Sequence, residues 1–236
     1  MTETTTGTPA PGANPHTNPP PHPDRPPSTT PALSHARAFT TWIERRSAEH
    51  PEARAALRRG AGKDLDAVPS MHQYVAPWLT EDHLQDRGIQ RAHYTVAALI
   101  AAQHSGQYPA TAQHTSEQPE REEGRSLGRS FADWVARGST GGGGPHEAGT
   151  ERRLSMLTRQ SAEGLHRHLP AAVRQLRHSG ITVDWAQLLV DLSLWRRHSG
   201  EVGRHWLQDY YQARQASAVH RAREADRHFD DTAKTT

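Results

Sequence analysis

The chain has 236 residues, of which 33% are hydrophobic, no cysteine, and a formal net charge of +2. The lack of cysteine excludes disulfides, thiolate nucleophiles and cysteine-ligated zinc or iron–sulfur sites. The first residues lack the basic and apolar regions of a secretory signal, and the longest apolar run, 94–102, is about half of what a membrane span needs. We therefore expect a soluble, cytoplasmic protein with no membrane partner.

Nearly all of the positive charge is arginine, and its distribution is uneven. Residues 105–124 carry four acids and one arginine, a net charge of −3, whereas 125–227 carry sixteen arginines and ten acids, a net charge of +6. A GC-rich genome explains a high arginine content but not this asymmetry. Because guanidinium groups bind phosphate in a forked geometry and stack on bases, the asymmetry favours a nucleic-acid partner.

The N-terminal third predicts a disordered tail followed by two helices. Residues 1–33 hold ten of the seventeen prolines and almost nothing apolar, so they are expected to be disordered. Ser34 is expected to cap a first helix over 34–49. Pro51 is expected to begin a second helix, which ends at Gly60.

Shorter elements are expected next. The prolines that bound residues 69–77 leave room for one helical turn, and Thr80 is expected to begin another helix. Residues 89–103 form a mostly apolar helix, and 107–124 form an acidic polar loop.

The C-terminal half predicts more helices. Residues 125–137 have an apolar face at helical spacing, and the glycines of 139–144 indicate a flexible linker. A helix is expected over 151–169, followed by a separate helix that Pro170 begins and Gly180 ends.

The organising stretch is 181–211, which holds three of the six tryptophans. Asp184 is placed to cap a helix, and Ser199-Gly200 is expected to break it before a second helix begins. The two aromatic stripes predict an αα-hairpin around one core. The apolar residues at three- and four-residue steps are Trp185, Leu188, Leu189, Leu192 and Trp195, then Val202, Trp206 and Tyr210.

A polar helix over 212–229 is expected to close the chain, and 230–236 are expected to fray. No segment shows sustained period-two alternation, so the predicted fold is all-α, a bundle of about seven or eight helices. The helices divide into two predicted parts, 34–106 and 125–229.

The residues predict no catalytic or metal site and no cofactor. The seventeen histidines are scattered, and the only close pair in a predicted helix, His166 and His168, is spaced so that the rings do not face each other. There is no Gly-x-Ser-x-Gly and no His-Glu-x-x-His motif. We therefore predict that the protein is not an enzyme.

Exposed arginines are the remaining candidates for a site. Arginines that several helices hold beside their apolar faces can line one groove for a single strand of nucleic acid. Equally, they can form solvated faces with intrahelical pairs to Glu and Asp. The candidates are Arg58, Arg59, Arg129, Arg152, Arg153, Arg174, Arg196 and Arg197.

The stretch 181–211 resembles the C-terminal signature of the CasB family, the small subunit of the type I-E CRISPR surveillance complex (Cascade). The signature residues are Asp184-Trp185, Leu188-Leu189, Trp195 and 206–211. The resemblance covers about 37–212, whereas the proline-rich tail and the glycine-rich linker have no counterpart. Further family motifs follow in order at Trp42, Arg58-Arg59, 69–77, 126–129 and 150–154.

The resemblance implies a non-catalytic subunit, present as two copies, that contacts the backbone and large subunits of the crRNA-guided complex. Its basic surface would hold the displaced, non-target DNA strand and stabilise the R-loop. By motif position it implies nucleic-acid contacts for Arg58, Arg59, Arg129, Arg152 and Arg153. The charge argument alone adds Arg174, Arg196 and Arg197. The alternative is a purely structural module whose arginines pair with acids of partner proteins.

Overall fold

The computed structural model describes residues 29–103, 124–141 and 147–234. Within these ranges the chain forms nine α-helices and three short 3-10 helices and contains no strand. This confirms the all-α prediction. Residues 1–28 of the expected tail over 1–33, 107–123 of the acidic loop and 142–144 of the linker over 139–144 lie outside the described residues, whereas 29–33 and 139–141 are helical.

The first helix begins earlier than expected. Helix α1 starts at Thr29, so Ser34 lies inside it and the predicted cap at Ser34 is wrong. Pro31 falls in the first turn, where a missing backbone N–H breaks no helical hydrogen bond. The N-terminal elements are α1 (Thr29–Glu49), α2 (Pro51–Arg58), η1 (Leu65–Ala67), η2 (Pro69–Met71), α3 (His72–Val75) and η3 (Ala76–Trp78).

Side-chain caps set the next two helices, α4 (Glu81–Gln85) and α5 (Arg87–Ala101). Thr80 Oγ1 accepts a hydrogen bond from His83 N at 3.3 Å, which confirms the predicted start near Thr80. Asp86 Oδ1 accepts from Gly88 N at 2.7 Å and therefore starts α5 two residues before the predicted position.

The predicted helix over 151–169 is wrong, because the chain breaks at 159–161. The observed helices are α6 (Leu127–Gly141), α7 (Glu147–Thr158) and α8 (Ala162–His178), and Pro170 lies inside α8. Ser161 caps α8 by accepting from Gly164 N at 3.2 Å. The Gln160 carbonyl at the break accepts from Trp195 Nε1 at 3.1 Å, so a distant side chain satisfies it.

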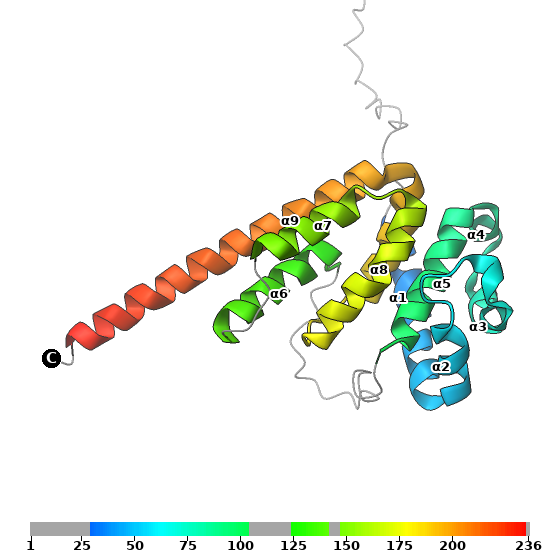
Figure 1. Ribbon diagram of the computed structural model, residues 1–236, viewed down its shortest axis with the longest axis horizontal. Helices are drawn as coiled ribbons and strands as arrows, with labels where there is room; N and C mark the ends of the chain where they lie inside the picture. Colours follow the sequence, from blue (N-terminus) through cyan, green and yellow to red (C-terminus); the bar gives the residue numbers. More distant parts are fainter. Residues whose placement is uncertain (1–28, 104–123, 142–146, 235–236) are drawn as a thin grey trace, which may run out of the picture.

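The last helix, α9 (Trp185–Lys234), bends sharply at His198, whose φ of −131° and ψ of 31° are not helical. The predicted break is confirmed, one residue before Ser199. Trp206 Nε1 donates to Asp191 Oδ2 at 2.6 Å, although a straight helix would separate these residues by about 22 Å. The helix predicted over 212–229 is the continuation of α9, which projects beyond the packed helices in Figure 1.

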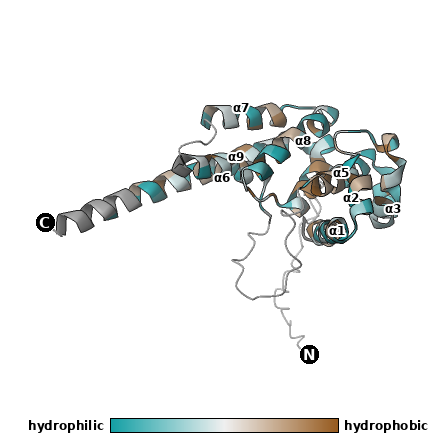
Figure 2. Ribbon diagram, turned by 60° about the horizontal axis from the view of Figure 1, so that its bottom comes forward, coloured by the Kyte–Doolittle hydropathy of each residue, from teal (hydrophilic) through white to brown (hydrophobic). Residues whose placement is uncertain are grey.

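The hydrophobic core is one cluster to which residues from both predicted parts contribute. Helix α9 packs against α1 and α5 from the first part and against α6 and α7 from the second. Figure 2 shows that α5 is rich in hydrophobic residues and lies within the packed body. The aromatic side chains of the described residues with 0–1% exposure are Phe39, Phe131, Trp195, Trp206 and Tyr210.

No helix among the described residues is both long enough and apolar enough to cross a membrane.

A buried carboxylate lies at the centre of the bent helix. Asp191 is 4% exposed and accepts hydrogen bonds from Trp206 Nε1 and from Gln187 Nε2, the latter at 2.7 Å. Burial raises the pKa of Asp191 to about 6, although both hydrogen bonds favour the ionised form.

The raised pKa of Asp191 predicts a pH-dependent stability. Between about pH 4 and pH 6, Asp191 is protonated in the folded protein and ionised in the unfolded chain. The free energy of unfolding therefore falls as pH rises across this range and levels off above about pH 6. In Asp191→Asn, the Asn oxygen can accept from Trp206 while the Gln187 amide turns to accept from its N–H group. We expect the stability of the wild type relative to Asp191→Asn to fall by on the order of 1 kcal/mol from pH 5 to pH 7 in urea unfolding. An equal difference at both pH values would contradict this assignment.

Close backbone contact between α6 and α9 depends on Gly128. A β-carbon at this position would overlap the backbone carbonyl of Trp206 and lie 2.8 Å from its Cα. Gly149 of α7 is a helical glycine with open space around it. A β-carbon on Gly149 would have no heavy atom within 4 Å, so this position serves as the matched control.

We expect Gly128→Ala to lower the free energy of unfolding by about 1–3 kcal/mol, because the two helices must move apart. Gly149→Ala is expected to leave it unchanged or to raise it by up to about 1 kcal/mol. Urea unfolding of both variants measures the difference, and equal effects would show that the α6–α9 contact accommodates a methyl group.

Candidate nucleic-acid interface

The eight predicted arginines lie on five helices. In Figures 1 and 2 the end of α2, where two of them lie, is distant from α7, so the eight do not line one groove. Their contact with nucleic acid stays a prediction. Arg58 lies in α2 and Arg59 at its C-cap, Arg129 in α6, Arg152 and Arg153 in α7, Arg174 in α8, and Arg196 and Arg197 in α9.

A shallow groove runs along α7 and includes one of these arginines, Arg152. Its volume is about 560 Å³, and it is lined by Ala148, Glu151, Arg152, Ser155, Met156, Arg159 and Gln160. Met156 is 38% exposed and adds an apolar surface between the cationic groups. An exposed groove in which two arginines outnumber one glutamate, with an apolar side chain between the arginines, can accept a phosphate backbone with adjacent bases.

The acids of α7 are held by α9. Tyr211 Oη donates to Glu151 Oε1 at 2.6 Å, and Arg214 forms an ion pair with Glu147 at 2.6 Å. Among the described residues, no carboxylate lies within ion-pair distance of Arg152 or Arg159. Glu151 also lines the groove, so its two arginines and one glutamate give it a formal net charge of +1.

Arg159 is a candidate that the sequence reasoning missed. It lies seven residues after Arg152, and two helical turns place such residues on the same face. This spacing was the available signal, although the chain leaves regular helix just after Thr158.

Two of the predicted arginines form ion pairs with carboxylates of the same chain. Arg197 pairs with Asp86 at 2.8 Å and so joins α9 to the N-terminus of α5. Arg129 lies 3.6 Å from Asp133, which also pairs with Arg125. These contacts reduce the charge that the two arginines offer to a phosphate.

The other predicted arginines are exposed or half-buried. Arg196 packs its aliphatic stem near the first turn of α5, 3.4 Å from the position of a β-carbon on Gly88. Arg58, Arg59 and Arg174 are exposed, and no carboxylate of the described residues forms an ion pair with them.

Histidines show two kinds of structural arrangement. His166 is buried, and its Nδ1 forms a hydrogen bond of 2.9 Å with Thr95 Oγ1, which joins α8 to α5. Burial lowers the pKa of His166 to about 4, so the ring is neutral near pH 7. His35, His83 and His93 are the described residues that could together hold a metal ion, and the sequence reasoning missed them.

Comparisons with known proteins agree on one family. A family model described as CRISPR-associated protein Cse2 matches residues 53–211. The chain is similar to a chain of a structure named CRISPR RNA-guided surveillance complex, with 32% identity, a TM-score of 0.67, and coverage of 80% of this chain and 98% of that chain. No curated protein matches significantly.

Two crystal structures of CasB are also similar to the chain. CasB from M. ruber is 25% identical, with a TM-score of 0.58 and coverage of 79% of this chain and 98% of that chain. CasB from Thermus thermophilus is 25% identical, with a TM-score of 0.53 and coverage of 75% and 97%.

Proposed function

The chain belongs to the CRISPR-associated Cse2 family, also named CasB, and on this basis we propose that it is the non-catalytic small subunit of a crRNA-guided type I-E interference complex in the cytoplasm. In this complex it bridges the backbone and large subunits, and a second copy of the chain lies beside it. Its arginine-bearing helices hold the displaced non-target DNA strand and thereby stabilise the R-loop. The observation that carries the proposal is the similarity to a chain of an RNA-guided surveillance complex over 98% of that chain.

The energetics of strand exchange suit such a surface. An RNA–DNA heteroduplex is about as stable as the DNA duplex that it replaces, so a few phosphate contacts can shift the balance toward the R-loop. The α7 groove, with Arg152 and Arg159 unpaired by carboxylates of the described residues, is the surface that supports this role best. Such contacts need no base recognition, which matches a strand whose sequence changes with every target.

The alternative is a structural role in which the arginines pair with acids of neighbouring subunits. The pairs Arg197–Asp86 and Arg129–Asp133 favour it, because they show arginines of this chain in use as protein contacts. The two roles differ in what a charge reversal on α7 changes: the lifetime of the R-loop, or assembly of the complex.

The first test is a pull-down of the tagged chain from its host, with sizing of co-purified RNA and identification of co-purified proteins. We expect one short RNA of uniform length and several unrelated subunits. Recovery of the chain alone, without RNA, would contradict the proposal that it is a subunit of an RNA-guided complex.

The second test reverses charge in α7. We expect Arg152→Glu with Arg153→Glu to shorten the R-loop lifetime by on the order of tenfold and to reduce its salt dependence, because phosphate contacts are lost. Circular dichroism should show an unchanged helix content, since Arg152 is exposed and Arg153 only half-buried.

The matched control is Arg221→Glu with Arg223→Glu, which makes the same change in charge on exposed positions of distal α9. We expect this control to leave the R-loop lifetime unchanged. An intact complex with an unchanged R-loop lifetime in the α7 variant would argue against the DNA-holding role, and a disrupted complex would favour the structural alternative.

A further inference from the structure

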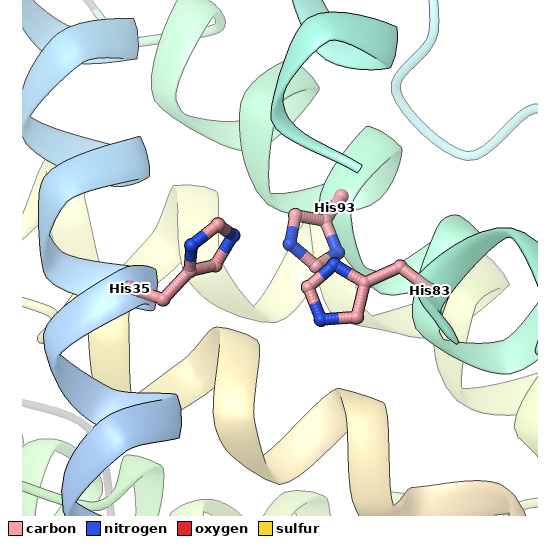
Figure 3. Close-up of side chains that lie close together, drawn as sticks. All are labelled: His35, His83 and His93. Carbon is pink, nitrogen blue, oxygen red and sulfur yellow. The ribbon is translucent and has the colours of Figure 1, made fainter. Parts of the chain in front are cut away.

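Three histidines from separate elements meet in the N-terminal part of the fold. His35 comes from α1, His83 from α4 and His93 from α5, and Figure 3 shows the three rings facing a common space. One nitrogen of each ring lies within 4.8 Å of one nitrogen of the other two. The ring centroids are 5.1 Å apart for His83 and His93 and 5.3 Å apart for His35 and His83.

Two of these rings hold buried nitrogens without a hydrogen-bond partner. His93 is 2% exposed, and its Nδ1 lies 2.9 Å from the Ile89 carbonyl, to which it donates. That bond leaves the lone pair on His93 Nε2, and neither His93 Nε2 nor His35 Nε2 has a partner among the described residues. Buried polar atoms of this kind cost about 1–3 kcal/mol each unless something binds them.

The arrangement of His93 is the one that metal-binding histidines usually show. One ring nitrogen donates to a backbone carbonyl, which fixes the ring, and the other presents its lone pair. Burial lowers the pKa of His93 to about 4, so near pH 7 the ring is neutral and that lone pair is present.

Aromatic packing does not explain why polar nitrogens are buried in this cluster. Phe39 and Trp78 contact the rings edge to face, with centroids 5.0 Å apart for Phe39 and His93 and 6.1 Å for His35 and Trp78. Apolar side chains of similar size would make these contacts without burying polar nitrogens. The aromatic walls account for the shape of the space, and they leave the two nitrogens unexplained.

We propose that His35, His83 and His93 bind one divalent transition-metal ion, Zn²⁺ in the first instance. Imidazole nitrogen is a preferred ligand of this class of ion, and three imidazoles with a water molecule complete a tetrahedron. Ligand atoms around tetrahedral Zn²⁺ lie about 3.3 Å apart, so small side-chain rotations must bring the three nitrogens closer. His35 and His83 are only half-buried, which leaves a path by which the ion enters.

Metal binding exchanges one weak hydrogen bond at the start of α4. Thr80 N donates to His83 Nδ1 at 3.3 Å, so in the neutral ring the proton lies on Nε2. Coordination by either nitrogen of His83 gives up this bond. Thr80 Oγ1 still accepts from His83 N, so the helix retains half of its capping box.

The ion would cross-link three helices, α1, α4 and α5. Helices α1 and α5 both pack against α9, and α4 packs against α5. We infer a structural role for the ion, because it would stabilise the folded state in proportion to its occupancy and needs no substrate.

The test uses the full-length chain without a polyhistidine tag, stripped by a chelator and titrated with Zn²⁺ alone by calorimetry. We expect one tight site, and a rise in the thermal midpoint of roughly 5–10 °C at a hundredfold excess over Kd. With Co²⁺ in place of Zn²⁺, we expect the visible d–d absorption of a tetrahedral complex.

The test variant is His83→Gln, whose amide oxygen can still accept from Thr80 N. The control is His168→Gln, an exposed histidine of α8 outside the cluster. We expect His83→Gln to weaken the tight site at least 10-fold and to abolish the Co²⁺ absorption, with no change in the control.

Equal Zn²⁺ affinity in the wild type and His83→Gln would overturn the proposal, because the ion would then bind among the other histidines. Absence of a tight site in the wild type would overturn it as well. If His83→Gln unfolds, the Co²⁺ spectrum of the wild type still decides: tetrahedral absorption at one equivalent supports the site, and its absence overturns it.

Discussion

The hydrogen bond from Trp206 Nε1 to Asp191 Oδ2 closes the bend of α9 and brings two arms of one helix into contact. It holds Trp195 and Trp206 with their ring centroids 5.0 Å apart. Trp195 in turn donates to the Gln160 carbonyl at the break between α7 and α8, and the backbone of Trp206 lies directly against Gly128 of α6. The positions of α6, α7 and α8 therefore depend on one buried carboxylate and two indoles. The desolvation cost of Asp191 is offset only while both of its donors stay in place.

Local patterns predicted the elements that local interactions determine. The apolar stripes, the cap at Thr80 and the break after Trp195 all follow from residues within one or two turns. The division between α7 and α8 does not, because the carbonyl exposed by that break is satisfied from α9. Pro170 favoured a helix start in the sequence, yet a helix interior tolerates the loss of one hydrogen bond when tertiary contacts hold its flanks. The division into the parts 34–106 and 125–229 also stays a prediction. The buried hydrophobic residues of both parts belong to one cluster.

The candidate surfaces show the same limit. Helical spacing places Arg152 and Arg159 on one face, and the pair of Arg129 with Asp133 is an i,i+4 pattern that the sequence displays. The pair of Arg197 with Asp86 joins residues more than a hundred positions apart, and nothing in the local sequence indicates it. The histidine cluster is a stronger case, because its members come from three elements and only the packing of α1, α4 and α5 brings them together. Scattered histidines in a sequence therefore say little about proximity in a fold.

The distal arm of α9 has a mechanical consequence. Beyond Arg214, which pairs with Glu147 of α7, the arm leaves the packed helices and continues to Lys234, a length of about 30 Å. Over that length, a rotation of about 6° at the base displaces the tip by about 3 Å. Any bending at the base is thus amplified along the arm. A neighbouring molecule that binds this end therefore acts on the body through a lever of about 30 Å.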